Sequence, residues 1–334
     1  MVKYVLGIDG GNTKTDYILY TTDGRFAGLK RMPTCSHEQL PGGFDDVRVT
    51  LSRHLEELYS LWGFTVKDLE CAAFGLAGCD TQTQQKILLD IILSLGFKDA
   101  VVANDGILGI KAVSPDGTGV CAINGAGTVI AGIDAKGRTM QVGGLGMMTD
   151  DRAGGGYIMR KAVAAVYAYH FRNGPATELT EPVLKAMNLP APADLHEAIS
   201  RPETYKSSMD NVNRAVDETA IKGDKTARDL FHEAGINVAD GVTGLIKAMD
   251  LKEPVRIVLG GSMWSEIKYT GLISSFKERI SADSEITLLN APPAVGAVIW
   301  ALQRVSPDEP DRKAVLDFLT RDRYKTLIKK DGLP

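Results

Sequence analysis

Short apolar runs and apolar residues at helical spacing alternate along the first third of the chain. Runs bounded by turn residues predict strands at 3–8, 15–20, 26–32, 71–78 and 100–106. Helical spacing predicts helices over 44–61 and 81–95. The order is three strands, a helix, a strand, a helix and a strand. This alternation predicts an α/β layer with a partly parallel sheet.

A second start follows, because the segment 118–138 repeats the order of residues 5–25. Ile-Asp-Gly at 8–10 corresponds to Ile-Asn-Gly at 123–125, and both copies end in a charged residue followed by Gly-Arg. The match is short and needs a two-residue gap, but the same strand pattern surrounds both copies. A duplicated α/β domain is therefore the interpretation that we favour.

The second half of the chain continues with similar elements. Helices are predicted at 153–171, 176–187 and 208–249, the last with a break near Gly223. The remaining predicted elements are strands at 255–262 and 285–290 and helices at 264–280 and 293–303.

This pattern leads us to expect two domains and a tail. The domains would span 1–117 and 118–303, and the charged tail 304–334 would carry a short amphipathic helix at about 312–329. We expect this tail helix to pack on the first domain. No low-complexity segment or long linker separates the halves, so they should pack together with a cleft between them.

Composition narrows the class of protein. The 334 residues suffice for two domains, and 44% apolar residues supply a sizeable core. The net charge of -4 comes without a basic block, so no nucleic-acid partner is expected. The first apolar run is too short for a signal peptide or a membrane span, so no membrane contact is expected. The four cysteines form no C-x-x-C pair, which favours reduced thiols in a cytoplasmic protein.

Four glycine-containing turns follow or begin predicted strands, at 9–15, 124–128, 143–146 and 259–262. In open α/β sheets ligands bind beyond the carboxyl ends of the strands, so these turns predict backbones that close on one ligand. Glycine lets successive N–H groups point into one concavity, and such a concavity suits phosphate oxygens.

Polar side chains add to this backbone. Thr13 and Thr15 in the first turn and Thr128 in the second supply hydroxyl donors, and Lys14 supplies charge. The first turn is not a P-loop, because Asn12 stands where that motif needs its second glycine. A phosphate clamp of a different kind is therefore expected.

The two copies differ at one informative position, where the first carries Asp9 and the second carries Asn124. Mg²⁺ is usually held through one or two carboxylates together with waters and substrate phosphates. Asp9 is therefore a candidate metal ligand, and an aspartate that caps its own turn is the alternative.

Further carboxylates lie outside these turns. Asp105 follows Asn104 at a strand end, where it either accepts a proton from a substrate hydroxyl or forms an Asp-Gly turn. Asp150 and Asp151 precede a glycine run, so they either cap a helix that begins near 154 or bind sugar hydroxyls. His37 lies in the stretch TCSHEQ, which by itself is typical of a solvated loop.

These motifs resemble the sugar kinase, Hsp70 and actin superfamily over about residues 3–303. Within it, the chain resembles the N-acetylglucosamine kinase branch, which is grouped with the BadF/BadG/BcrA/BcrD ATPases, the ATPase subunits of benzoyl-CoA reductase and related activators. The resemblance implies an α/β fold of duplicated ribonuclease H-like (actin-like ATPase) domains with an interdomain cleft.

The same resemblance implies roles for individual residues. Asp105 would be the catalytic base and Asp9 the Mg²⁺ ligand. The implied ATP-binding residues are Gly10, Gly11, Asn12, Thr13, Lys14, Gly125, Gly127, Thr128, Gly260, Gly261 and Ser262. The implied sugar-binding residues are Ser36, His37, Asn104, Asp105, Gly144, Leu145, Asp151 and Gly155.

The implied activity is an ATP-dependent carbohydrate kinase that uses Mg²⁺, acts on an amino sugar and forms a homodimer. N-acetylglucosamine, phosphorylated to the 6-phosphate, is the first candidate substrate. Leu145 replaces the family's tryptophan, Arg152 replaces its glutamate, and the loop 34–37 lacks its asparagine. N-acetylmuramic acid and glucosamine therefore stay as alternatives, and Arg152 raises the question of an acidic substrate.

Two rival functions belong to other classes. An activator ATPase of the 2-hydroxyacyl-CoA dehydratase or benzoyl-CoA reductase type would hold an iron–sulfur cluster between two subunits, which needs cysteine thiolates at the interface. No cysteine pair of that kind is evident in the sequence. A sugar sensor without catalysis is the other rival, and the presence of both Asp9 and Asp105 argues against it.

Overall fold

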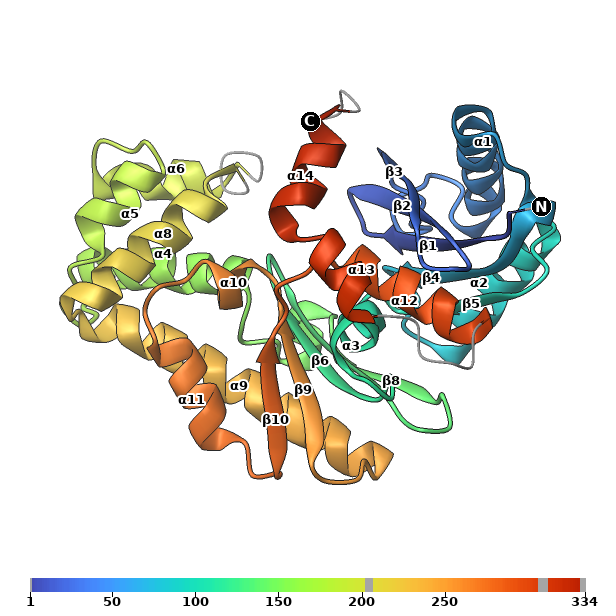
Figure 1. Ribbon diagram of the computed structural model, residues 1–334. Coiled ribbons are helices and arrows are strands. Elements are labelled where there is room, and N and C mark those ends of the chain that lie inside the picture. Colours follow the sequence, from blue (N-terminus) through green and yellow to red (C-terminus); the bar gives the residue numbers. More distant parts are fainter. Residues whose placement is uncertain (1, 202–206, 306–311, 331–334) are drawn as a thin grey trace.

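Two mixed sheets of five strands form the framework of the chain (Figure 1). The computed structural model describes residues 2–201, 207–305 and 312–330. The first sheet contains β1 (Tyr4–Gly10), β2 (Lys14–Thr21), β3 (Phe26–Pro33), β4 (Leu69–Leu76) and β5 (Ala100–Ala103). The second contains β6 (Gly119–Asn124), β7 (Thr128–Ile133), β8 (Thr139–Gly143), β9 (Val255–Gly260) and β10 (Ser284–Leu288).

The two sheets have the same topology. Their strand orders are β3-β2-β1-β4-β5 and, read in the matching direction, β8-β7-β6-β9-β10. In each, the central strand pairs antiparallel with the next strand of its hairpin and parallel with the strand on its other side. The predicted duplication of an α/β domain is thus confirmed.

Helices surround these sheets. In chain order they are α1 (Phe44–Trp62), α2 (Gln82–Ser94), α3 (Gly106–Val113), α4 (Gly155–Phe171), α5 (Thr180–Ala186), α6 (Leu195–Ile199), α8 (Met209–Lys222), α9 (Lys225–Met249), α10 (Ser262–Ser265), α11 (Gly271–Arg279), α12 (Pro293–Val305), α13 (Arg312–Phe318) and α14 (Arg321–Lys330). Among the residues described, no helix is both long and apolar enough to span a bilayer.

Several predicted boundaries need correction. The predicted strand 100–106 ends at Ala103, because the Asn104 side chain accepts the Gly106 N–H at 2.8 Å and turns the chain into α3. The predicted helix 264–280 is two helices, α10 and α11, and the predicted tail helix 312–329 is also two, α13 and α14. The expected break near Gly223 is confirmed, since Gly223 ends α8 with a φ of 114° and the Asp224 carboxylate caps α9.

Alternating residues of β1 bury both faces of the first sheet. Leu6 and Ile8 pack with α1 and α2, while Val5 packs with α12 and the tail helices. The helix α12, which follows the second sheet in the chain, therefore lies on the first sheet. The division into 1–117, 118–303 and 304–334 stays our proposal, with α12 shared between the domains.

Helix α3 faces α12 between the two sheets. Ile107 and Ile110 of α3 pack on β6, β7 and β9 of the second sheet. The backbones of α3 and α12 cross closely, because a Cβ at Gly296 of α12 would lie 1.8 Å from the Leu108 carbonyl oxygen. These two helices hold the domains together.

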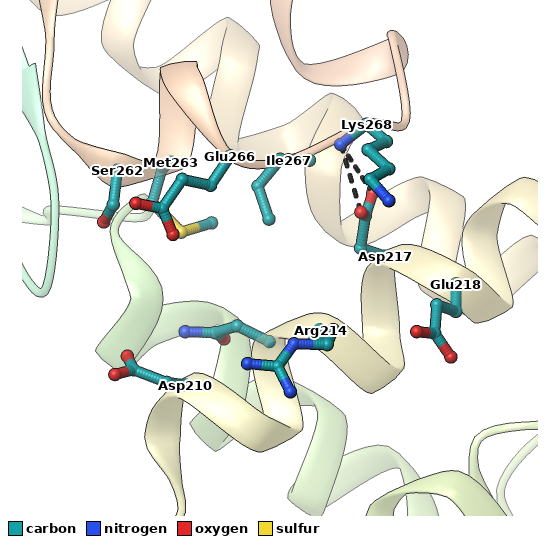
Figure 2. A pocket seen from close by; sticks show the side chains of 10 residues that line it. Asp210, Arg214, Asp217, Glu218, Ser262, Met263, Glu266, Ile267 and Lys268 are labelled. Atoms are coloured by element: carbon teal, nitrogen blue, oxygen red, sulfur yellow. Dashed lines mark hydrogen bonds between the residues drawn. The ribbon is translucent and has the colours of Figure 1, made fainter. Parts of the chain in front are cut away.

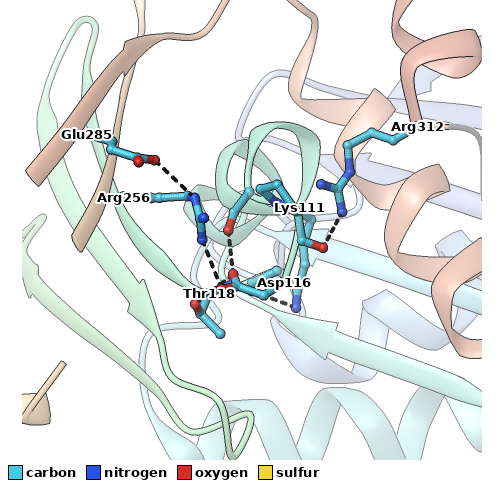
Figure 3. Close-up of polar contacts among 9 residues, drawn as sticks. Lys111, Asp116, Thr118, Arg256, Glu285 and Arg312 are labelled. Carbon is cyan, nitrogen blue, oxygen red and sulfur yellow. Dashed lines mark hydrogen bonds and ion pairs between the residues drawn. The ribbon is translucent and has the colours of Figure 1, made fainter. Parts of the chain in front are cut away.

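A polar network fixes the connection from α3 to the second sheet (Figure 3). The Asp116 carboxylate accepts hydrogen bonds from the Ser114 hydroxyl at 2.7 Å and from the Arg256 guanidinium at 2.9 Å. Lys111 donates to the Gly117 carbonyl at 2.9 Å, and Arg312 of the tail donates to the Pro115 carbonyl at 2.8 Å. Groups from α3, β9 and α13 thus converge on one short connection.

Candidate active site

The first glycine turn joins β1 to β2 as a tight hairpin. The Gly11 N–H donates to the Lys14 carbonyl at 2.9 Å, and the Thr34 hydroxyl donates to the Gly11 carbonyl at 2.7 Å. Thr15 is fully buried and bonds to Cys35, so the expectation that its hydroxyl would meet a phosphate is wrong. The hairpin therefore offers its tip, and not its base, to a ligand.

A cavity of about 280 Å³ lies beyond this tip. It is lined by Asp9, Gly11, Thr13 and Lys14 of the first turn, by Asp105, and by Gly260 and Gly261 of the turn after β9, together with Gly109, Cys121, Ile123, Leu289 and Pro293. Residues predicted from three separate motifs are thus brought to one place. Gly10 and Asn12 flank the lining residues of the first turn.

Two carboxylates of this cavity resist ionisation. Burial, followed by the negative charge of Asp105, raises the pKa of Asp9 to about 7. Burial, followed by the negative charge of Asp80, raises the pKa of Asp105 to about 6. An approaching cation would favour the ionised form of Asp9, and a carboxylate with a pKa near 6 is suited to accept a proton near neutral pH.

The backbone on either side of Asp105 is held in place by the side chain of Asn104. Asn104 is 8% exposed, accepts the Gly106 N–H and donates to the Asp80 carboxylate at 2.8 Å. Asp105 itself begins α3, and no side-chain cap occupies its carboxylate. Asp105 lines the 280 Å³ cavity, where a ligand can reach it.

A second, smaller cavity of 190 Å³ lies beside Asn104. Asp80, Asn104 and Gln141 are among its lining residues, so it lies between the first sheet and β8. The loop with Ser36 and His37 lies close by, because the Ser36 hydroxyl contacts the Ala77 carbonyl at 3.4 Å and a Cβ at Gly78 would meet His37 at 2.6 Å. Sequence reasoning had not identified Asp80 or Gln141, since neither belongs to a recognisable motif.

The second glycine turn is braced by the helix that follows it. Gly155, expected to bind substrate, is buried and donates its N–H to the Gly125 carbonyl at 2.7 Å. A Cβ at Gly154 would lie 2.8 Å from the Gly127 backbone. Gly155 thus supports the turn from behind.

Asn124 and Thr128 close the same turn. The Thr128 hydroxyl donates to the Asn124 side-chain oxygen at 3.1 Å, and Asn124 is fully buried. Among the described residues, the Asn124 side-chain nitrogen has no hydrogen-bond partner. The backbone of Asn124 lies against Gly261, whose Cβ would be 2.4 Å from the Asn124 carbonyl oxygen. The second turn and the turn after β9 therefore meet directly.

The segment after β8 forms an exposed loop. The Asp151 carboxylate accepts the N–H groups of Gly144 at 2.9 Å and Gly146 at 2.8 Å, so it shapes the loop around it. Leu145 is 65% exposed. A ligand would meet Asp151 only on the side of the carboxylate away from these two bonds.

Arg152 is already paired. Its guanidinium donates to Glu233 at 3.0 Å and lies 3.1 Å from the Asp150 carboxylate. Two carboxylates therefore surround one cation, which leaves no surplus positive charge for an acidic substrate.

A third cavity, of 260 Å³, opens beside Ser262 (Figure 2). Asp210, Arg214 and Glu218 of α8 line one side, and Ser262 and Glu266 line the other. Asp217 accepts the N–H groups of Lys268 at 3.0 Å and Tyr269 at 2.8 Å, which fixes the chain after α10 against α8. Ser262 thus connects this cavity with the glycine turn after β9.

The described residues contain no group of three or more His, Cys, Asp or Glu side chains that could hold a metal ion. The donor set around Asp9 nevertheless fits Mg²⁺, because this ion is commonly bound by one or two carboxylates plus waters and substrate phosphates. Asp9 lines the cavity, and its pKa is raised by burial and then by the negative charge of Asp105, so a bound cation would favour its ionised form.

Comparisons with known proteins agree with this architecture. An N-acetylmuramic acid/N-acetylglucosamine kinase of Clostridium acetobutylicum is 26% identical over 90% of this chain and 98% of its own length. An N-acetyl-D-glucosamine kinase of Dictyostelium discoideum is 22% identical over 89% of this chain and 97% of its own length. The solved structure of the ROK hexokinase from Thermus thermophilus matches 91% of this chain and all of its own, with a TM-score of 0.55 and 17% identity.

A solved structure from Chromobacterium violaceum is more similar in fold, with a TM-score of 0.66, 19% identity, and coverage of 90% of this chain and 99% of its own. The duplicated sheets and these matches define the two-domain, actin-like fold. The model of the BadF/BadG/BcrA/BcrD ATPase family matches residues 6–301, and the chain belongs to this family.

Proposed function

We propose that this chain is an ATP-dependent kinase that phosphorylates a hydroxyl of an amino sugar, with N-acetylglucosamine as the first candidate and the 6-phosphate as its product. The observation that carries the proposal is the 280 Å³ cavity shared by Asp9, Asp105 and the turn at Gly260 and Gly261. The names of the two relatives from Clostridium acetobutylicum and Dictyostelium discoideum support it.

ATP would bind where the glycine turns meet. The first turn offers Gly11, Thr13 and Lys14 to the phosphates. The adenosine end would lie near Ser262, where the cavity beside α8 opens. Mg²⁺, held by Asp9 and the phosphates, would supply charge neutralisation at the transferred group.

Asp105 would accept the proton of the attacking hydroxyl. Asp105 lines the phosphate cavity, and Asn104, the residue before it, lines the 190 Å³ cavity. A sugar in the smaller cavity would therefore direct a hydroxyl towards the phosphates. Positioning and charge stabilisation provide most of the rate enhancement in this type of reaction.

The charge around the substrate loop favours a neutral sugar. Arg152 is shared between Glu233 and Asp150, so it gives no attraction to the carboxylate of N-acetylmuramic acid. We therefore place N-acetylglucosamine before N-acetylmuramic acid and glucosamine.

A coupled assay of ADP release tests this proposal. The protein with Mg²⁺ and ATP is screened against N-acetylglucosamine, N-acetylmuramic acid, glucosamine, N-acetylmannosamine and glucose. We expect the highest kcat/KM with N-acetylglucosamine. If no sugar in this set stimulates ADP release, the proposal of an amino-sugar kinase fails.

The cysteines argue against the rival function as an activator ATPase. Cys35, Cys71, Cys79 and Cys121 are all free and at most 5% exposed, so none is available to bind a cluster at a subunit interface. Buried reduced thiols suit a reducing compartment, and we propose the cytoplasm. A homodimer also remains a proposal, which sedimentation analysis would test.

A further inference from the structure

The tail helices lie beyond the family match, which ends at residue 301. Helix α14 is nevertheless firmly anchored on the first domain. Tyr324 and Ile328 are each 4% exposed and pack with residues of β1, β2 and β3. The Tyr324 hydroxyl donates to the Asp16 carboxylate of β2 at 2.7 Å. The position of α14 relative to the first glycine hairpin is therefore fixed.

The anchored helix borders a cavity of 460 Å³ with strongly basic walls. Arg321, Lys325 and Lys329 lie four residues apart on α14, so they share one face of the helix, and this face lines the cavity. Lys14 and Arg31 line it from the first sheet. Glu266 is the single carboxylate among its described lining residues.

Part of this charge lacks a carboxylate partner. Lys14 and Arg31 share Asp16, at 3.2 Å and 2.7 Å. Arg321 donates to the Leu289 carbonyl, and no ion pair of Arg321, Lys325 or Lys329 occurs within the part of the chain that the structure describes. The cavity therefore has the electrostatic character of an anion site.

This basic cavity adjoins the phosphate cavity. Lys14, Gly261, Leu289 and Pro293 line both. An anion that extends out of the phosphate cavity past Lys14 therefore enters the space in front of α14. Continuity with the proposed nucleotide site favours the nucleotide's own phosphates over an unrelated anion.

We propose that α14 completes the nucleotide site, with Arg321 and Lys325 binding phosphate oxygens of ATP and ADP. This inference rests on the proposed nucleotide site of the kinase, but it does not depend on which acceptor is phosphorylated. Arg321 and Lys325 act here as nucleotide-binding residues that the family motifs do not include.

Binding measurements test the inference without any sugar. The dissociation constants of ADP and of adenosine are measured by calorimetry or by competition for the wild-type chain and for the double variant Arg321→Gln/Lys325→Gln. Because each lost charge-assisted contact with a phosphate weakens binding, we expect the double variant to bind ADP roughly tenfold more weakly. The affinity for adenosine, which has no phosphate, should not change.

Arg323→Gln is the matched control, because it removes one charge from the same helix. The Arg323 guanidinium stacks over Phe318 and does not line the cavity. It should leave ADP binding unchanged. The single variant Lys325→Gln, at an exposed position, should give a smaller loss in the same direction and serves if the double variant does not fold.

The possible results separate the two proposals. Unchanged ADP binding in the double variant, or an equal loss for ADP and adenosine, would overturn the role of α14. Weakened ADP binding in a chain that phosphorylates no sugar would support the role of α14 and contradict the kinase proposal. A wild-type chain that binds neither ADP nor adenosine would refute both.

Discussion

The two glycine turns have equivalent places in two equivalent sheets, yet they face different surroundings. The first turn has a free tip, and Asp9, Thr13 and Lys14 line the phosphate cavity. The second turn is held by backbone hydrogen bonds from the start of α4, and its Asn124 and Thr128 are buried. The first copy of the duplicated motif thus offers charged groups to a ligand. The second copy mainly holds its own backbone, and that of the neighbouring turn after β9, in place.

This difference explains why a carboxylate is tolerated in only one copy. Asp9 is partly accessible from the cavity. Burial raises its pKa to about 7, so a cation or a proton can neutralise it. Asn124 is fully buried, where an ionised carboxylate would lack compensation. The comparison therefore predicts different outcomes for matched substitutions in the two turns.

The largest effect is expected outside both turns, at Asp105. Asp105→Asn keeps the shape of the side chain and removes its ability to accept a proton. We expect kcat to fall by about 10²–10⁴-fold. Measurement of kcat with the preferred sugar, together with calorimetric ADP binding, checks this. Near-normal turnover would remove Asp105 from the mechanism, and a parallel loss of ADP binding would indicate a structural role.

The next effect concerns the first turn. Asp9→Asn makes this turn resemble the second one and removes the candidate ligand of Mg²⁺. We expect kcat to fall by roughly 10²-fold and the Mg²⁺ concentration for half-maximal rate to rise. A titration of rate against Mg²⁺ measures both. An unchanged Mg²⁺ requirement would favour the turn-capping interpretation of Asp9.

The reciprocal change, Asn124→Asp, should affect stability. It puts a carboxylate at a fully buried position. We expect a loss of about 2 kcal/mol in the free energy of unfolding, because the charge is desolvated or must bind a proton. Urea denaturation at pH 7 measures this loss. If Asn124→Asp is as stable as wild type, the burial difference between the two turns does not explain their sequences.

The smallest effect is a pH dependence. Because the pKa of Asp105 is raised to about 6, its basic form is lost below that pH. With saturating Mg²⁺, kcat/KM should rise about tenfold per pH unit up to about pH 6 and then level off. In Asp80→Asn the negative charge that helps to raise this pKa is absent, so the rise should shift to lower pH. An unshifted profile would assign the titration to another group.

Much of the fold follows from local sequence signals. The strand and helix order of the first third, the internal duplication and the break at Gly223 can all be predicted, because each depends on apolar spacing or on one glycine. The split of the tail into α13 and α14 was not predicted, since the amphipathic pattern runs through both helices. The position of α12 on the first sheet was also missed, because chain order alone assigns it to the second.

The candidate site divides in the same way. Asp9, Asp105 and Gly261 lie in motifs that a sequence displays, and the structure brings them to one cavity. Asp80 and Gln141 reach the second cavity from separate segments, and only tertiary packing brings them near Asn104. Gly155 shows the opposite case, because its motif suggested a sugar contact while its N–H is used by the second turn.

The crossing of α3 and α12 has a consequence for the distance between the turns. With no side chain at Gly296, the two helices touch backbone to backbone where they cross between the sheets. Helix α12 is in equally close contact with β1, where a Cβ at Gly7 would lie 2.6 Å from the Val298 nitrogen. This pair of helices therefore sets the distance between Asp9 of β1 and Gly261, which directly follows β9 of the second sheet. A methyl group added at Gly296 would force the backbones of α3 and α12 apart. A misplacement of about 1 Å at the reacting groups is enough to cost 10²-fold in rate.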